Sequence, residues 1–165
     1  MPTPDLEERF QRWLKLISEM HDNNANFTPN ESRAWAPMRK PLVKCTIALV
    51  STAGVHLKSQ PAHNLLAAHG DASFRGIPGD THGSDIAVDH AHYDTTDANI
   101  DPNCVFPIDR LRELVEMGII GAVAPLHYGF MGFIPDGRML RDTTAPIVAE
   151  QLLKQGTDVV VLTPG

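Results

Sequence analysis

The sequence predicts a three-layer α/β domain with a mainly parallel sheet and a helical N-terminal extension. Three apolar runs, at residues 44–52, 119–124 and 158–162, are typical of strands that are buried on both faces of a parallel sheet. Two predicted helices, at 108–117 and from Ala145 to Gly156, directly precede the second and third runs. A helix, a glycine and then a strand within a few residues make half of a βαβ unit.

Composition limits the class of protein. A chain of 165 residues is about one domain, and its 42% hydrophobic and 21% charged residues are ordinary for a soluble protein. The net charge of −6 argues against a nucleic-acid partner, and no apolar run approaches the ~20 residues of a membrane span. Two widely spaced cysteines indicate a reducing compartment, which we expect to be the cytoplasm.

The N-terminal segment predicts an amphipathic helix. Thr3 can serve as its N-cap and Pro4 as its first residue. One apolar stripe follows at helical spacing: Leu6, Phe10, Trp13, Leu14 and Ile17. Residues 22–41 form an Asn- and Pro-containing connector. We therefore expect a helical extension and linker at 1–40 and an α/β domain at 41–165.

The α/β domain has recognisable element boundaries. Its first strand leaves through the small residues of the loop that starts at Ala53, and residues 73–77 alternate like a short strand before the turn at 78–80. Pro107 fits the first position of the helix at 108–117, and Gly118 fits its C′ position. Residues 125–132 follow at the carboxyl end of the second strand, which is the sheet edge where α/β proteins place ligands.

The stretch with the most candidate catalytic or metal-binding side chains is 90–94, with the sequence HAHYD. Three of the eight histidines lie between Asp80 and Asp101. If residues 86–94 are extended, His90, His92 and Asp94 point to one face, because side chains alternate along a strand. Two imidazoles and a carboxylate on one face can move protons, position a substrate or bind a metal such as zinc.

Other candidate side chains follow strands. His56 and His127 come after the first and second predicted strands, so we expect them to face the same cleft as His90. Arg75 is a candidate partner for a substrate carboxylate, because its guanidinium group is a planar fork of donors. A metal site on His90, His92 and Asp94 would need a further ligand, for which His56, His82 and His127 are candidates.

Several stretches together, in this order, resemble the selenoprotein B family of glycine, sarcosine, betaine and D-proline reductases. They are ALVSTAGVHL at 48–57, SFRGIPGDT at 73–81, HAHYD at 90–94, DPNCVFPIDRL at 101–111, GIIGAVAP at 118–125 and FMGFIP at 130–135. The resemblance covers roughly residues 43–165. It implies a component of a selenol- or thiol-dependent reductase that cleaves a carbon–nitrogen bond in a small, amino-acid-like substrate.

The resemblance also implies a redox residue outside the given sequence. In the family, a selenocysteine or cysteine follows a strand and turn like VLTPG at 161–165. A helix N-terminus at that position would favour the selenolate or thiolate anion. We expect selenocysteine at position 166, with the sequence ending at Gly165 through termination or truncation at its codon, and no cofactor within residues 1–165.

The resemblance implies partners as well: a small-molecule substrate, a reductase partner subunit and a thioredoxin-like reductant. We also expect a homo-oligomer. We assign proton handling or substrate positioning to His90, His92 and Asp94, and substrate binding to His56, Arg75 and His127. Two alternatives stay open at this point: a metal-dependent hydrolase that uses His90, His92 and Asp94, and a non-catalytic scaffold subunit.

Overall fold

The computed structural model describes residues 5–20 and 36–165, and the chain divides into two compact units, 1–36 and 37–165. The first unit contains helix α1 (Leu6–Met20), as the apolar stripe predicts. Within this helix the rings of Phe10 and Trp13 stack with their centroids 5.9 Å apart. Most of the predicted connector, residues 21–35, lies outside the described residues.

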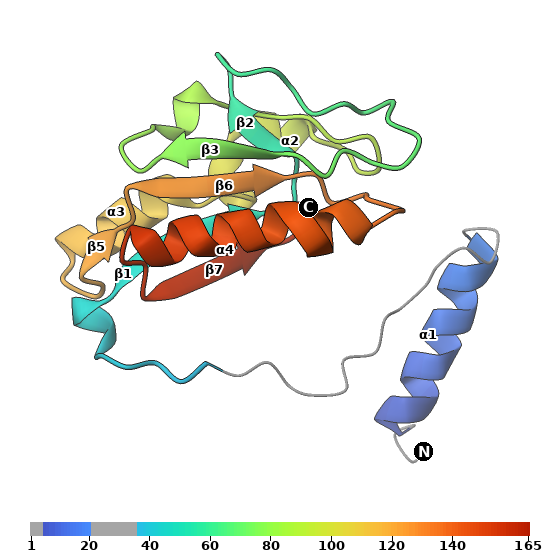
Figure 1. Cartoon of the computed structure of the whole chain (residues 1–165), viewed down its shortest axis with the longest axis horizontal. Helices are drawn as coiled ribbons and strands as arrows, with labels where there is room; N and C mark the ends of the chain where they lie inside the picture. Colours follow the sequence, from blue (N-terminus) through green and yellow to red (C-terminus); the bar gives the residue numbers. More distant parts are fainter. Residues whose placement is uncertain (1–4, 21–35) are drawn as a thin grey trace. The chain divides into compact units, whose positions relative to one another are not determined.

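The second unit contains all the strands (Figure 1). They are β1 (Thr46–Ser51), β2 (Val55–Leu57), β3 (Phe74–Pro78), β4 (Ile86–Val88), β5 (Ala122–Val123), β6 (Leu126–Phe130) and β7 (Val159–Thr163). Its helices are α2 (Thr96–Ile100), α3 (Ile108–Glu116) and α4 (Ala145–Lys154), with short helical turns at Leu42–Lys44, Gly83–Asp85, Pro102–Cys104 and Leu140–Thr144.

The main sheet is built on β1. This strand pairs in parallel with β7 along one edge, and with β5 and then β6 along the other. β3 pairs antiparallel with β6, and β2 and β4 form a separate antiparallel pair. The prediction of a mainly parallel sheet is therefore confirmed.

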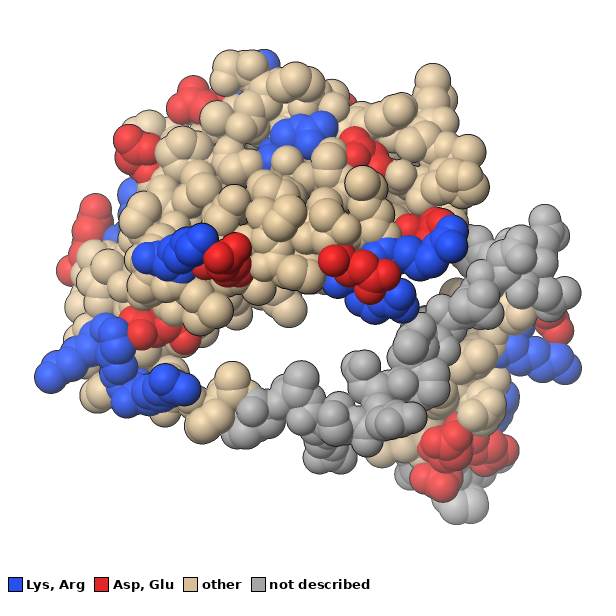
Figure 2. All heavy atoms as spheres, in the orientation of Figure 1, with Lys and Arg blue, Asp and Glu red and all other residues tan. Residues whose placement is uncertain are grey.

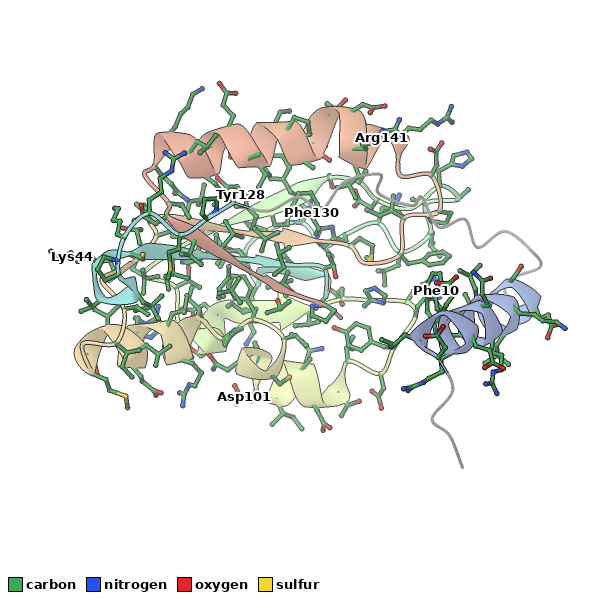
Figure 3. All side chains as sticks on the ribbon, turned by 90° about the horizontal axis from the view of Figure 1, so that it is seen from below. Phe10, Lys44, Asp101, Tyr128, Phe130 and Arg141 are labelled. Carbon is green, nitrogen blue, oxygen red and sulfur yellow. The ribbon has the colours of Figure 1, made fainter. Side chains whose placement is uncertain are left out.

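The sheet lies between two apolar layers. Ile47 and Leu49 of β1 pack into a core with α2, α3, β2 and β4, whereas Ala48 packs with α4 on the other face. Figure 3 shows Tyr128 and Phe130 of β6 in the layer between the sheet and α4. Because alternate residues of a strand face opposite sides, the apolar run of β1 supplies both cores. The predicted three-layer arrangement is confirmed.

Three strand predictions are corrected. The second strand is only Ala122–Val123. The segment 125–132, for which no strand was predicted, contains the largely buried strand β6, which Pro125 separates from β5. β7 forms where predicted but is not buried on both faces, since Leu162 is 73% exposed. The extended run predicted at 86–94 ends at Val88, so the residues after it are not held by strand pairing.

A histidine ring fills the gap between β5 and β6. Thr46 and Ile47 pair with Ala122 and Val123, whereas Val50 and Ser51 pair with Tyr128 and Gly129, so residues 124–127 stand opposite only residues 48–49. In this bulge the Leu49 backbone N–H donates to Nδ1 of the fully buried His127, at 2.8 Å. The imidazole thus replaces a missing backbone acceptor, which a buried N–H requires.

Charged side chains are interspersed on the face seen in Figure 2, where Lys and Arg lie beside Asp and Glu. Lys40 Nζ, for example, is 2.7 Å from Asp158 Oδ2, and Arg141 Nε is 2.7 Å from Asp142 Oδ1. Among the described helices, none is long and apolar enough to cross a bilayer.

Gly129 is required where β2 crosses β6. A Cβ atom on Gly129 would lie 1.9 Å from the Val55 carbonyl oxygen, whereas one on Gly137 would meet nothing within 4 Å. Gly129→Ala is expected to destabilise the fold by about 2 kcal/mol or more, because backbone must move. Urea unfolding should show this loss, with Gly137→Ala close to wild type; equal midpoints for the two variants would contradict this packing.

Two buried histidines make stability depend on pH. Burial, with a nearby arginine, lowers the pKa of both His63 and His127 to about 4 from the usual 6.5. Their stabilising neutral state is complete above about pH 6.5 and is lost as pH falls towards 4, by up to ~3 kcal/mol per histidine. Urea unfolding between pH 4 and 7 should show a shallower acid slope for His127→Gln than for wild type. Exposed His69→Gln should keep the wild-type slope; an unchanged slope in His127→Gln would contradict the assignment.

Candidate functional site

The carboxyl ends of three parallel strands meet at one edge of the sheet. The Thr52 N–H, just after β1, donates to the carbonyl of Thr163 at the end of β7. The Gly54 N–H donates to the carbonyl of Phe130 at the end of β6, and Ala53 bridges Met131. Loops that follow such strand ends are where α/β proteins bind ligands, because backbone groups there are not used by the sheet.

The segment DPNCVFPIDRL builds a support under this edge. The Val105 carbonyl accepts hydrogen bonds from Ser51 Oγ, at 3.1 Å, and from Thr163 Oγ1, at 2.7 Å. The segment itself is fixed by Asp109, whose carboxylate accepts bonds from the Gly83 N–H, from Asn103 and from Arg112. These hydrogen bonds also lower the pKa of Asp109 against the opposing effect of burial, so it stays ionised. The strand ends therefore rest on an ordered loop.

The loop that follows β4 lies over the strand ends. Tyr93 donates its hydroxyl hydrogen to the Ala53 carbonyl at 2.9 Å. A Cβ atom on Gly132 would lie 3.0 Å from His90 Nε2 and 2.7 Å from the Thr52 carbonyl oxygen. A Cβ atom on Gly165 would likewise lie 3.0 Å from the Tyr93 ring. His90 and Tyr93 thus stand beside the residues that leave β1, β6 and β7.

His90 presents one ring nitrogen to this edge. The His92 N–H donates to His90 Nδ1 at 3.0 Å, so the neutral ring carries its proton on Nε2. Burial lowers the pKa of His90, and the nearby His92 adds to the effect, which favours that neutral form. The side chain therefore offers an Nε2–H donor towards Gly132 and the end of β1.

The three residues of the predicted catalytic group do not all converge. His90 and His92 have ring centroids 6.0 Å apart, and the His92 ring packs on Phe133 with a centroid distance of 3.8 Å. Asp94 is exposed, and its Oδ1 accepts two bonds from Thr96 at the start of α2. These bonds lower the pKa of Asp94, which acts as a capping carboxylate for the helix.

The predicted substrate-binding residues are occupied by protein contacts. His127 lies inside β6, and His56 is only 4% exposed in β2, with both ring nitrogens hydrogen-bonded. Arg75 bonds to the carbonyls of Pro61 and Ala62 and to Ser73, where it closes a loop. His56 and Arg75 are satisfied within the fold, and His127 uses Nδ1 while its buried Nε2 has no hydrogen-bond partner.

Sequence reasoning missed Tyr93 and Gly132 as parts of the site. The sequence position of Tyr93, between His92 and Asp94, could have marked it as a candidate. Its hydrogen-bond partner Ala53, however, is forty residues away in the sequence. Across the described ranges 5–20 and 36–165, no group of three or more His, Cys, Asp or Glu side chains is arranged to hold a metal ion. His82, a candidate fourth ligand, is exposed before the turn at Gly83.

Comparison with known proteins gives a consistent set of relatives. D-proline reductase subunit gamma of Acetoanaerobium sticklandii is 47% identical over 131 residues, which cover 79% of this chain and 53% of the relative. The glycine reductase complex component B subunit gamma of Symbiobacterium thermophilum is 33% identical, over 77% of this chain and 30% of the relative. That of Carboxydothermus hydrogenoformans is 31% identical, over 77% and 29%.

The chain therefore spans about half the length of the first of these relatives and less than a third of the others. No solved structure matches it significantly. A family model described as glycine/sarcosine/betaine reductase selenoprotein B matches residues 15–165, which is nearly the whole chain. The chain belongs to this selenoprotein B family of reductases.

Proposed function

We propose that this chain is the part of a reductase complex that presents a small, amino-acid-like substrate to a selenol or thiol at the carboxyl edge of its sheet. The main observation behind this proposal is the position of His90. Its Nε2 faces the residues that follow β1 and β6, and it lies beside Tyr93 and Gly165. Membership of the family and the names of the relatives, which are reductase subunits, support the reaction class.

The proposed reaction is reductive cleavage of a carbon–nitrogen bond. The carbon and the amine nitrogen each gain a hydrogen, which together require two electrons and two protons. A dithiol reductant, such as a thioredoxin-like partner, supplies the electrons and becomes a disulfide. Oxidation of the dithiol also releases the two protons. His90, which stays neutral, would donate a hydrogen bond from Nε2–H to the departing amine, where negative charge develops as the carbon–nitrogen bond breaks.

We further propose that the redox residue is a selenocysteine directly after Gly165. The position of Gly165 supports this proposal, because a Cβ atom there would lie 2.5 Å from Ala53 Cα and 3.0 Å from the Tyr93 ring. A following residue would therefore start beside the loop that holds His90. The free cysteines Cys45 and Cys104 are consistent with a reducing, cytoplasmic setting.

Replacement of His90 tests the hydrogen-bond donor. In a complex reconstituted from the full-length subunit and its partners, His90→Ala is expected to lower turnover by about 100-fold, the usual contribution of one hydrogen bond to a developing negative charge. D-proline, glycine, sarcosine and betaine are offered with a dithiol reductant, and the freed amine or ring-opened product is measured. His82→Ala is the matched control, because His82 is exposed and lies before a different turn. Turnover of His90→Ala equal to that of the control would exclude His90 as the donor.

Selenium content tests the redox residue. The native protein, purified from cells grown with selenium, is expected to carry one selenium atom in the peptide that contains residues 159–165. Intact mass and peptide mass spectrometry provide the measurement, and a cysteine at position 166 would support only the thiol form. A native C-terminus at Gly165 would rule out the proposed redox position.

A further inference from the structure

His56 is buried, yet both of its ring nitrogens have hydrogen-bond partners. Nδ1 is 2.8 Å from the Leu57 carbonyl oxygen, and Nε2 is 2.7 Å from Asp89 Oδ2. The side chain of Asp89 remains 44% exposed, so the pair reaches from the core of β2 to the surface. A buried imidazole with two short bonds has no freedom to turn towards a substrate.

The partners also define where the protons are. A carbonyl oxygen can only accept, so His56 Nδ1 must carry a hydrogen. A further hydrogen lies between Nε2 and Asp89 Oδ2, because two lone pairs 2.7 Å apart would repel each other. The other titratable or charged groups on this side are His63, with its ring centroid 6.4 Å from that of His56, and Asp71 and Arg75 beside His63.

Asp89 is the residue directly before His90, and its backbone is fixed as well. The Asp89 N–H donates to the Gly54 carbonyl at 3.2 Å. Gly54 has a φ of +77°, and a Cβ atom there would lie 2.0 Å from the Asp89 carbonyl oxygen, so the two backbones touch. Tyr93 binds Ala53 at the other end of the loop. His90 thus lies between two residues, Asp89 and Tyr93, that are hydrogen-bonded to residues 53–54.

We propose that His56 and Asp89 form a positioning pair that fixes His90 over the carboxyl ends of β1 and β6. This inference rests on the proposed function for the role of His90. His56 acts through Asp89 and the loop, and does not contact the substrate. Because the strand ladder ends at Val88, the pair is the side-chain contact that fixes the start of this loop, beside the backbone bond from Asp89 to Gly54.

Nuclear magnetic resonance of the full chain tests the pair without any activity. The His56 ring N–H that faces Asp89 is expected to give a slowly exchanging signal, because it is buried and hydrogen-bonded. In Asp89→Asn the amide is isosteric but uncharged, so this hydrogen bond should weaken and the ring N–H signal should exchange faster. The His92 amide, bonded to His90, should then exchange about tenfold faster, because the loop opens more often.

The control is Asp97→Asn, which removes an exposed carboxylate from the first turn of α2 and should leave both signals unchanged. A wild-type chain without a slowly exchanging His56 ring N–H signal would overturn the proposal, even if Asp89→Asn failed to fold. Unchanged His92 exchange in a folded Asp89→Asn would also overturn it.

Turnover separates this proposal from the proposed function. In the reconstituted complex, Asp89→Asn is expected to lower kcat by about tenfold or more with a nearly unchanged KM, because a misplaced donor slows the chemical step more than binding. Equal losses in kcat for Asp89→Asn and Asp97→Asn would overturn the pair. Absence of turnover in the wild-type complex would overturn the proposed function, whereas the resonance experiment would still decide the pair.

Discussion

Strand β1 is the constraint on which the rest of the second unit depends. Its six residues pair with β7 on one edge and share the other edge between β5 and β6. Its side chains enter both apolar cores, so neither layer can form without it. Because β6 and β7 run parallel to β1 and pair with its last residues, their carboxyl ends meet where β1 ends. The candidate site is a geometric result of this pairing.

Much of the fold could be predicted because local patterns and tertiary structure agree there. α1, α3 and α4 have periodic apolar stripes or clear ends, such as Gly118 with its φ of +67° after α3. The strand β6 was missed because Pro125 stands directly before it and Gly129 lies within it. In addition, the break in the backbone hydrogen bonds at Leu49 is closed by a side chain, that of His127. No local sequence pattern predicts that a histidine ring will replace a peptide carbonyl as the hydrogen-bond acceptor.

The site was predictable in part for the same reason. The density of histidines around residue 90 predicted a loop that does lie at the carboxyl edge of the sheet, but the extended geometry predicted for 86–94 was wrong. The chain after Val88 is held by Asp89 on His56 and by Tyr93 on Ala53, which are contacts over more than thirty residues. Alternation along a strand therefore does not decide which side chains share a face. Asp94 illustrates the consequence, since its carboxylate caps α2.

The histidines are best distinguished by which ring atoms the fold leaves available. His56 uses both nitrogens and His127 uses Nδ1 in the sheet, while burial keeps His63 neutral at ordinary pH. His90 uses only Nδ1 within the fold, where it accepts a hydrogen bond from the His92 N–H, and it directs Nε2 towards the strand ends. The sequence motif does not distinguish the roles of His90 and His92, but their hydrogen bonds do. The backbone N–H of His92 orients the ring of His90. That asymmetry leaves the His90 Nε2–H as a hydrogen-bond donor at this edge.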